Sequence, residues 1–113
     1  MGISIIIPCY NYESLIIEKY HKLKKKADNI KENIEIIFID DGSTDNTYKK
    51  LKILQKKNKR IKILKNQTNQ GKSFSLIFGI KKSKYNKIVI YACDLPYFNY
   101  FNNTISALDK RTL

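Results

Sequence analysis

Short apolar runs alternate along the chain with segments whose apolar residues recur at helical spacing. This alternation constrains the fold more than any other feature, because strands separated by helices pair in parallel and the helices cover the sheet. Nearly continuous apolar runs are typical of strands that are buried on both faces. The expected strands are 3–8, 35–39, 61–64 and 87–92, and the expected helices are 14–27, 46–57, 73–82 and 100–110. We therefore predict a single α/β domain over residues 1–113 with a mainly parallel sheet.

Helical spacing also predicts which side chains of the second and third helices point into the core. In the second helix these are Tyr48, Leu51 and Leu54. In the third helix they are Phe74, Ile77, Phe78 and Ile80.

The composition fits a folded and strongly basic protein. Hydrophobic residues make up 42% of the 113, which is too many for a disordered basic tail, and the formal net charge is +12. Twenty of the 22 basic residues are lysines, which A/T-rich codons favour together with isoleucine and asparagine. The lysines are scattered instead of lying among stacking aromatics, so no specific nucleic-acid interface is predicted. Solvated lysine faces are the first interpretation, and an anionic membrane surface or nucleic acid is the second.

The apolar runs and the cysteines favour a cytoplasmic protein. No apolar run approaches the roughly 20 residues that span a bilayer, and we recognise no secretory leader. Cys9 and Cys93 are too few for a disulfide framework or a structural zinc site. We therefore expect a cytoplasmic location, with the inner face of the membrane as the anionic surface to which the chain would bind peripherally.

Polar and chemically versatile residues follow three of the four expected strands. The first strand runs into Pro8-Cys9-Tyr10-Asn11-Tyr12-Glu13, the second into Asp40-Asp41-Gly42-Ser43-Thr44-Asp45, and the fourth into Cys93-Asp94-Leu95-Pro96. In open α/β sheets, ligands bind beyond the carboxyl ends of the strands, where the strand order reverses. The sequence therefore predicts a ligand site at this edge of the sheet.

The carboxylates at this edge have two possible roles. Asp40 and Asp41 follow five apolar residues, where a carboxylate needs a polar partner such as a nucleobase N–H, a ribose hydroxyl or a divalent metal. Asp94 is placed to hold Mg²⁺ or Mn²⁺ through a single carboxylate. The alternative is structural: Asp41, Ser43 or Asp45 caps the second helix, and Asp94 is a turn residue.

The segment Asn69-Gln70-Gly71-Lys72 opens the third helix and suits an anion, because glycine permits close backbone approach and Lys72 adds charge at a helix N-terminus. Tyr10 and Tyr12 are candidates for stacking on a base or for packing in the core. Other familiar schemes do not fit. No glycine-rich fingerprint follows the first strand, no Walker A string is present, and His21 has no plausible nucleophile partner.

These strings together resemble the N-terminal half of the family 2 glycosyltransferases. The residues that carry the resemblance are Ser4-Ile5-Ile6-Ile7-Pro8-Cys9-Tyr10-Asn11, Ile39-Asp40-Asp41-Gly42-Ser43-Thr44-Asp45, Asn69-Gln70-Gly71-Lys72 and Asp94-Leu95. Their order and spacing match the family from Ile3 to about Tyr97. The continuation Leu95-Pro96-Tyr97 is most similar to members that use polyprenyl-phosphate acceptors.

The resemblance implies a three-layer, Rossmann-like GT-A fold with sheet order 3-2-1-4. It also implies a UDP- or GDP-linked sugar as donor, transfer with inversion, and a divalent metal, Mg²⁺ or Mn²⁺, on the diphosphate. By position, the residues that would line the nucleotide sugar are Pro8, Tyr10, Asn11, Glu13, Asp40, Asp41, Lys72 and Asp94. Among these, Asp40 would contact the base and Asp94 would face the metal.

Two departures from the family pattern matter. The metal motif usually reads Asp-x-Asp, whereas Ala92-Cys93-Asp94 stands here, so we expect weaker metal binding. We also expect the acceptor half and its catalytic base to be missing, and no residue is nominated as that base. Two hypotheses stay open: the donor-binding part of an enzyme, or a non-catalytic chain, which is either a module that binds a nucleotide or nucleotide sugar or an inactive truncated remnant. Such a part would expose apolar surface around the fourth strand and residues 97–108, and would bind a partner chain or a second copy.

Overall fold

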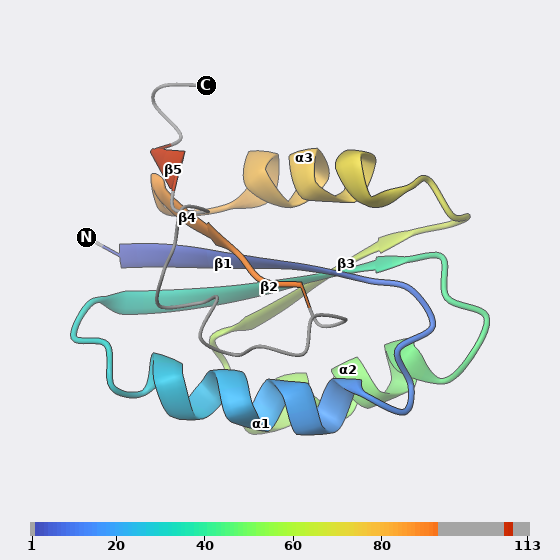
Figure 1. The fold of residues 1–113 in the computed structure, drawn as a ribbon, viewed down its shortest axis with the longest axis horizontal. Helices are drawn as coiled ribbons and strands as arrows, with labels where there is room; N and C mark the ends of the chain where they lie inside the picture. Colours follow the sequence, from blue (N-terminus) through green and yellow to red (C-terminus); the bar gives the residue numbers. More distant parts are fainter. Residues whose placement is uncertain (1, 93–107, 110–113) are drawn as a thin grey trace.

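The computed structural model describes residues 2–92 and 108–109, and in them strands and helices alternate (Figure 1). The elements in chain order are β1 (Gly2–Cys9), α1 (Ile16–Ala27), β2 (Asn33–Asp41), α2 (Thr47–Lys57), β3 (Ile61–Asn66), α3 (Lys72–Lys82), β4 (Lys87–Ile90) and β5 (Leu108–Asp109). The first seven correspond to the seven elements expected between residues 3 and 92. Their type and order are confirmed.

The five strands form one sheet in the order β3-β2-β1-β4-β5. β1 pairs in parallel with β2 on one side and with β4 on the other, and β2 pairs in parallel with β3. The order 3-2-1-4 implied by the resemblance is therefore confirmed. The chain runs outward from β1 to β3 and then crosses back to the far side of β1, so the strand order reverses between β1 and β4.

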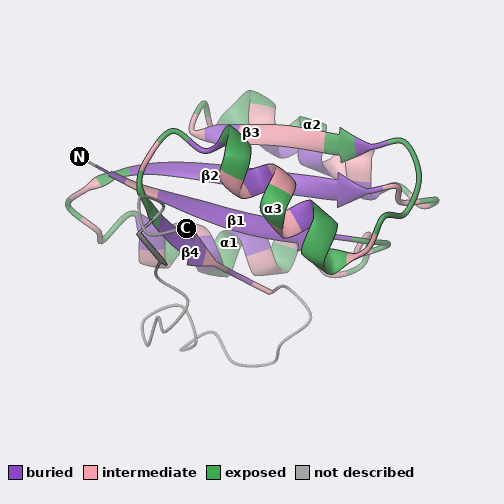
Figure 2. Cartoon of the chain, turned by 90° about the horizontal axis from the view of Figure 1, so that it is seen from above, coloured by how far each residue is buried: buried purple, intermediate pink, exposed green. Residues whose placement is uncertain are grey.

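The core consists of two apolar layers, one on each face of the sheet. α1 and α2 cover one face and α3 covers the other (Figure 1). Because side chains alternate along a strand, Ile5 and Ile7 of β1 pack on the side of α1 and α2, whereas Ile6 packs on the side of α3. β1 and β2 are buried along almost their whole length, as Figure 2 shows. The continuous apolar runs predicted strands that are buried on both faces, and helices do cover both faces of these strands.

α3 presents a different face to the sheet from the one predicted. Its buried residues are Ser75 and Gly79, whereas Phe74 and Ile77 are 51% and 54% exposed. Phe78 and Ile80 are partly buried against the core, as predicted. A Cβ on Gly79 would lie 2.7 Å from Cδ1 of Ile39 and 2.8 Å from Cγ2 of Ile6, so the helix approaches the sheet most closely at the glycine. The prediction that Phe74 and Ile77 point inward is wrong because small residues face the sheet here.

Two further expectations need correction. Leu51 and Leu54 of α2 are buried as expected, but Tyr48 is only half-buried, and Nζ of Lys65 lies 4.3 Å from the centre of its ring. The helix expected over 100–110 is wrong at residues 108 and 109, which form β5 and pair antiparallel with β4. The remaining residues of that expected helix lie outside the described part of the chain.

None of the helices in the described ranges has the length and apolar character that crossing a bilayer requires.

Candidate functional site

The turn after β1 brings the first group of candidate residues to the carboxyl edge of the sheet. Pro8 is buried inside β1 next to Ile39 of β2, and Tyr10 follows the strand with 42% of its side chain exposed. Asn11 has a positive φ of 54°, a conformation that asparagine tolerates better than most residues. The chain turns sharply at this point and leads towards α1.

Asp40 lies at the end of β2, directly beside Cys9 at the end of β1. It is fully buried, and its Oδ1 accepts one hydrogen bond from the backbone N–H of Ser43 at 3.2 Å. Its Oδ2 is also buried and accepts no hydrogen bond within the described residues. Buried carboxylate oxygens without a donor are rare and unfavourable, so this atom is the most prominent feature of the edge.

Asp41, the next residue, differs from Asp40 because both of its carboxylate oxygens accept hydrogen bonds. Its Oδ1 accepts from the amide of Asn66 at 2.9 Å and from the N–H of Gln70 at 2.7 Å. Its Oδ2 accepts from the amide of Asn69 at 3.2 Å and from the N–H of Gly71 at 3.0 Å. Four donors occupy the positions at which a carboxylate accepts. Asp41 therefore holds the loop before α3 in place, a stronger structural role than the helix cap considered from the sequence.

Gly42 allows the β2–α2 turn to approach that same loop. Its φ is 72°, and a Cβ here would lie 2.5 Å from the carbonyl carbon of Thr68 and 2.6 Å from the backbone nitrogen of Asn69. No larger residue fits between two backbones at this separation.

Reciprocal hydrogen bonds join the β1–α1 turn to the β2–α2 turn. Asn11 donates its N–H to Oγ of Ser43 at 2.9 Å, and its Oδ1 accepts from the N–H of Thr44 at 2.8 Å. Glu13 accepts from the N–H and the side-chain amide of Asn46 at 3.3 and 3.1 Å. The side chains of Asn11 and Glu13 thus bind protein in this structure, and they set the distance between the two turns.

Asp45 completes this connection. Its Oδ2 accepts from the N–H of Glu13 at 3.2 Å, and its Oδ1 accepts from the N–H of Thr47 at 2.9 Å and from the Thr47 hydroxyl. Burial raises the pKa of Asp45, but the hydrogen bonds from Thr47 and Glu13 outweigh it, and the pKa lies below its ordinary value. Asp45 is therefore ionised at neutral pH and binds Thr47, the first residue of α2. The capping alternative is wrong in its position, because the N-cap residue is Asn46, which makes no side-chain capping hydrogen bond.

Lys72 is the first residue of α3 and is exposed. The preceding Gly71 has a φ of 96°, and a Cβ there would meet no atom within 4 Å. The glycine is required by the backbone conformation and not by crowding. Since Asp41 binds the N–H groups of Gln70 and Gly71, the buried end of β2 positions the start of α3 and Lys72 with it.

The structure thus brings Pro8, Asn11, Glu13, Asp40 and Asp41 together at the ends of β1 and β2 and in the two connected turns that follow. Tyr10 lies at the same edge. Lys72 begins α3, after a loop that Asp41 binds. Four of the ten acidic residues lie at this edge of a chain with net charge +12: Glu13, Asp40, Asp41 and Asp45. Sequence reasoning named Asn69 as part of the segment before α3 but missed Asn66, and both bind Asp41. A usable signal for Asn66 was present, because this amide stands at the end of a strand, as Asp40 and Asp41 do.

The predicted metal ligand, Asp94, lies outside the described residues. Within residues 2–92 and 108–109, no group of three or more His, Cys, Asp and Glu side chains is arranged to hold a metal ion. Asp41 has no free acceptor position to offer, and Asp40 contributes one oxygen. Metal binding and the nucleotide-lining roles of these residues therefore stay predictions.

Comparison with known proteins identifies the family. The sequence model of the family described as "Glycosyl transferase family 2" matches residues 4–97 of the chain. The chain belongs to this family. An uncharacterised family 2 relative from Bacillus subtilis, glycosyltransferase YkcC, is 36% identical over 92 residues, which cover 81% of this chain and 28% of that protein. Dolichol-phosphate mannosyltransferase from Pyrococcus furiosus is 29% identical over 97 residues, which cover 86% of this chain and 27% of that protein.

Two solved structures share the fold. Residues 1–349 of S. aureus TarS, in complex with UDP-GlcNAc, align with a TM-score of 0.73 at 28% identity, and the alignment covers 83% of this chain and 27% of that one. The Pyrobaculum calidifontis mannosyltransferase PcManGT, in complex with GDP-Man and Mn²⁺, aligns with a TM-score of 0.74 at 20% identity. The alignment covers 92% of this chain and 31% of PcManGT. The GT-A fold is confirmed. The chain spans less than a third of the length of each of the four proteins compared here.

Proposed function

We propose that this chain is the donor-binding part of a family 2 glycosyltransferase that takes a sugar from a UDP- or GDP-linked donor and transfers it with inversion. The observation that carries this proposal is Oδ2 of Asp40, which is buried at the carboxyl edge of β2 and has no donor among the described residues. An N–H of uracil or guanine would supply that hydrogen bond. The complex of TarS with UDP-GlcNAc, and that of PcManGT with GDP-Man, support the choice of nucleotide.

The other predicted residues have roles that follow from their positions. Tyr10 is exposed beside the base-binding carboxylate and offers a ring for stacking. Lys72 adds positive charge at the start of α3, where an anionic diphosphate is favoured. Asn11, Glu13 and Asp41 hold the three turns in one arrangement, so that Asp40 and Lys72 keep a constant separation.

A divalent metal would neutralise the diphosphate leaving group, and the Mn²⁺ bound to PcManGT supports this part of the proposal. Asp94 is the residue that we propose for it, with Ala92 in place of the first carboxylate of the usual motif. The name of the Pyrococcus furiosus relative, a dolichol-phosphate mannosyltransferase, favours a polyprenyl phosphate as acceptor.

Calorimetric titration with UDP and with GDP, each with and without Mn²⁺, tests the proposal. We expect one nucleotide to bind, more tightly with Mn²⁺, and Asp40→Asn to weaken binding by about tenfold or more, because a charge-assisted hydrogen bond is replaced by a neutral one. Asp28→Asn is the matched control, since Asp28 is exposed beyond the end of α1. Circular dichroism of both variants checks that they are folded.

Two results would contradict the proposal. If neither nucleotide binds, the chain is not a donor-binding part. If Asp40→Asn binds as tightly as the wild type while remaining folded, the assignment of the base site to Asp40 is wrong.

A further inference from the structure

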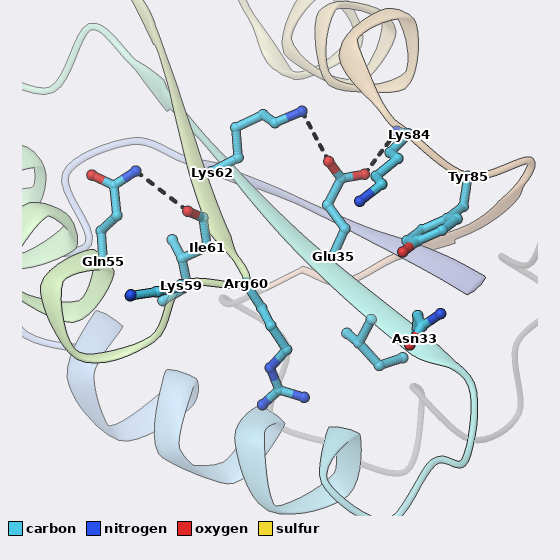
Figure 3. Close-up of a pocket in the computed structure, with 10 residues that line it drawn as sticks. Asn33, Glu35, Gln55, Lys59, Arg60, Ile61, Lys62, Lys84 and Tyr85 are labelled. Carbon is cyan, nitrogen blue, oxygen red and sulfur yellow. Dashed lines mark hydrogen bonds and ion pairs between the residues drawn. The ribbon is translucent and has the colours of Figure 1, made fainter. Parts of the chain in front are cut away.

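A second concave site lies at the opposite edge of the sheet from Asp40. It is a pocket of about 560 Å³ formed by the starts of β2 and β3, the loop before β4, and Gln55 of α2 (Figure 3). This volume lies within the range of small-molecule pockets, roughly 300–1,000 Å³. We call it the amino-edge pocket, because strands β2 and β3 begin there.

Cationic side chains dominate this pocket. Lys59, Arg60 and Lys62 come from the segment that enters β3, and Lys84 comes from the loop between α3 and β4. Figure 3 shows Lys84 and Tyr85 on one side of the opening, and Lys59 and Arg60 on the other. Glu35 is the one carboxylate in the lining.

That carboxylate is already fully engaged with protein. Oε2 of Glu35 accepts from the Ser4 hydroxyl at 2.6 Å and from the N–H of Lys84 at 2.8 Å. Its Oε1 forms an ion pair with Nζ of Lys62 at 2.9 Å. Glu35 therefore balances the charge of Lys62, and Asp28 balances that of Arg60.

Two of the four cations keep their charge available for a ligand. Arg60 is not one of them, because it forms an ion pair with Asp28 at 2.7 Å. Lys59 and Lys84 have no carboxylate within 4.0 Å among the described residues, and Nζ of Lys84 lies 5.4 Å from the centre of the Tyr85 ring. The Tyr85 ring is held in place, since a Cβ on Gly2 would lie only 2.6 Å from its Cζ.

We propose that the amino-edge pocket binds a phosphate-bearing anion. Cations from separate segments surround this one concavity, and Glu35, the one acid that lines it among the described residues, is already paired with Lys62. Cations on opposite sides favour a ligand with at least two negative charges, and a phosphate or diphosphate group has them at neutral pH. The phosphate belongs either to a free compound or to a lipid headgroup. The proposal is independent of the donor site, which lies at the other end of the strands.

Titration of the 113-residue chain with inorganic pyrophosphate at low ionic strength tests this inference. We expect Lys59→Gln/Lys84→Gln to weaken binding by about tenfold or more, because two charge-assisted contacts are lost. The matched control is Lys49→Gln/Lys56→Gln, which removes the same charge from exposed positions on α2 and should change affinity by no more than about twofold. Amide chemical shifts should move at residues 59–62 and 84–85.

Vesicle binding distinguishes the two sources of phosphate. If sedimentation with phosphatidylglycerol vesicles, but not with phosphatidylcholine vesicles, is lost in the pocket variant and kept in the control, the ligand is a lipid headgroup. If only pyrophosphate binding is lost, the ligand is a free phosphate compound. If the pocket variant and the control variant weaken the binding of pyrophosphate and of vesicles equally, the proposal is overturned, because net charge alone would then explain binding. Unchanged binding in the pocket variant would overturn it as well.

Discussion

At the scale of single residues, two of the three buried acids of β2 have surroundings that differ completely. Glu35, near the start of the strand, receives hydrogen bonds from Ser4 and Lys84 and an ion pair from Lys62. Asp40, at the end of the strand, has one oxygen with a single donor and another with none among the described residues. A buried carboxylate whose oxygens both accept hydrogen bonds stabilises a fold. A buried carboxylate oxygen without a donor costs free energy, and a ligand that supplies the donor can offset this cost. Glu35 is therefore interpreted as structural and Asp40 as functional.

Glu35 should make the stability of the protein depend on pH. Burial raises its pKa, but the Ser4 hydroxyl, the Lys84 N–H and Lys62 together lower it below the ordinary value of 4.5. Because the pKa is lower in the folded state, the stabilisation is present above about pH 4.5 and is lost as the pH falls through the folded-state pKa. Glu35→Gln should lower the free energy of unfolding by about 1–3 kcal/mol at pH 7, and the difference should shrink at pH 3.

Urea unfolding at both pH values measures this difference. The control is Glu18→Gln, which removes an exposed ion pair with Lys22 and should change the free energy of unfolding by less than about 0.5 kcal/mol. A difference between wild type and Glu35→Gln that stays constant from pH 7 to pH 3 would show that the carboxylate does not gain its stabilisation from ionisation.

At the scale of elements, α3 is placed by its smallest residues. Ser75 and Gly79 form the buried stripe of this helix, and the helix rests on Ile6 and Ile39, which are fully buried. Ser75 also accepts a hydrogen bond from the buried amide of Asn66, which donates to Asp41 as well. The packing of α3 and the loop that precedes it are thus coupled at the end of β2.

Gly79→Val should destabilise the protein by about 1–3 kcal/mol, because the new side chain must displace two buried isoleucines or push α3 away from the sheet. Phe74→Ser, on the exposed side of the same helix, should change the free energy of unfolding by about 0.5 kcal/mol or less. Chemical denaturation of both variants provides the comparison. If Phe74→Ser proves the more damaging of the two, α3 packs with the face that its periodicity predicted.

At the scale of the whole molecule, the sheet separates two sites of opposite charge. Acidic residues gather beyond the carboxyl ends of β1 and β2, and cationic residues surround the pocket at the starts of β2 and β3. β1 lies between β2 and β4, and β2 lies between β1 and β3, so these two strands connect the sites through the best-buried part of the structure (Figure 2).

Amide hydrogen exchange should reflect this arrangement. We expect the slowest exchange in residues 3–6 and 36–40, which have paired neighbours on both sides and helices on both faces. Residues 61–66 form the edge strand β3 and should exchange faster. Exchange followed by mass spectrometry or NMR tests the order, and protection of residues 61–66 equal to that of β1 would contradict it.

Much of the fold followed from local patterns in the sequence. The strand and helix order up to residue 92 was predictable because burial on both faces of a strand and amphipathic spacing in a helix are properties of neighbouring residues. The strings from Pro8 to Asn11 and from Asp40 to Asp45 also pointed to the family, and to the edge of the sheet on which a ligand would bind. The strand order, by contrast, came from the resemblance and not from periodicity.

Only the tertiary structure decided what each polar residue contacts. Asp40 and Asp41 are adjacent in the sequence and look equivalent there, yet Asp41 binds donors 25 to 30 residues away while Oδ2 of Asp40 binds none among the described residues. The face of α3 and the amino-edge pocket likewise depend on residues that the chain separates widely, such as Gly79 with Ile6 and Lys84 with Glu35. Periodicity in the sequence predicts whether a side chain is buried. Which residues that side chain contacts depends on how segments far apart in the sequence pack together.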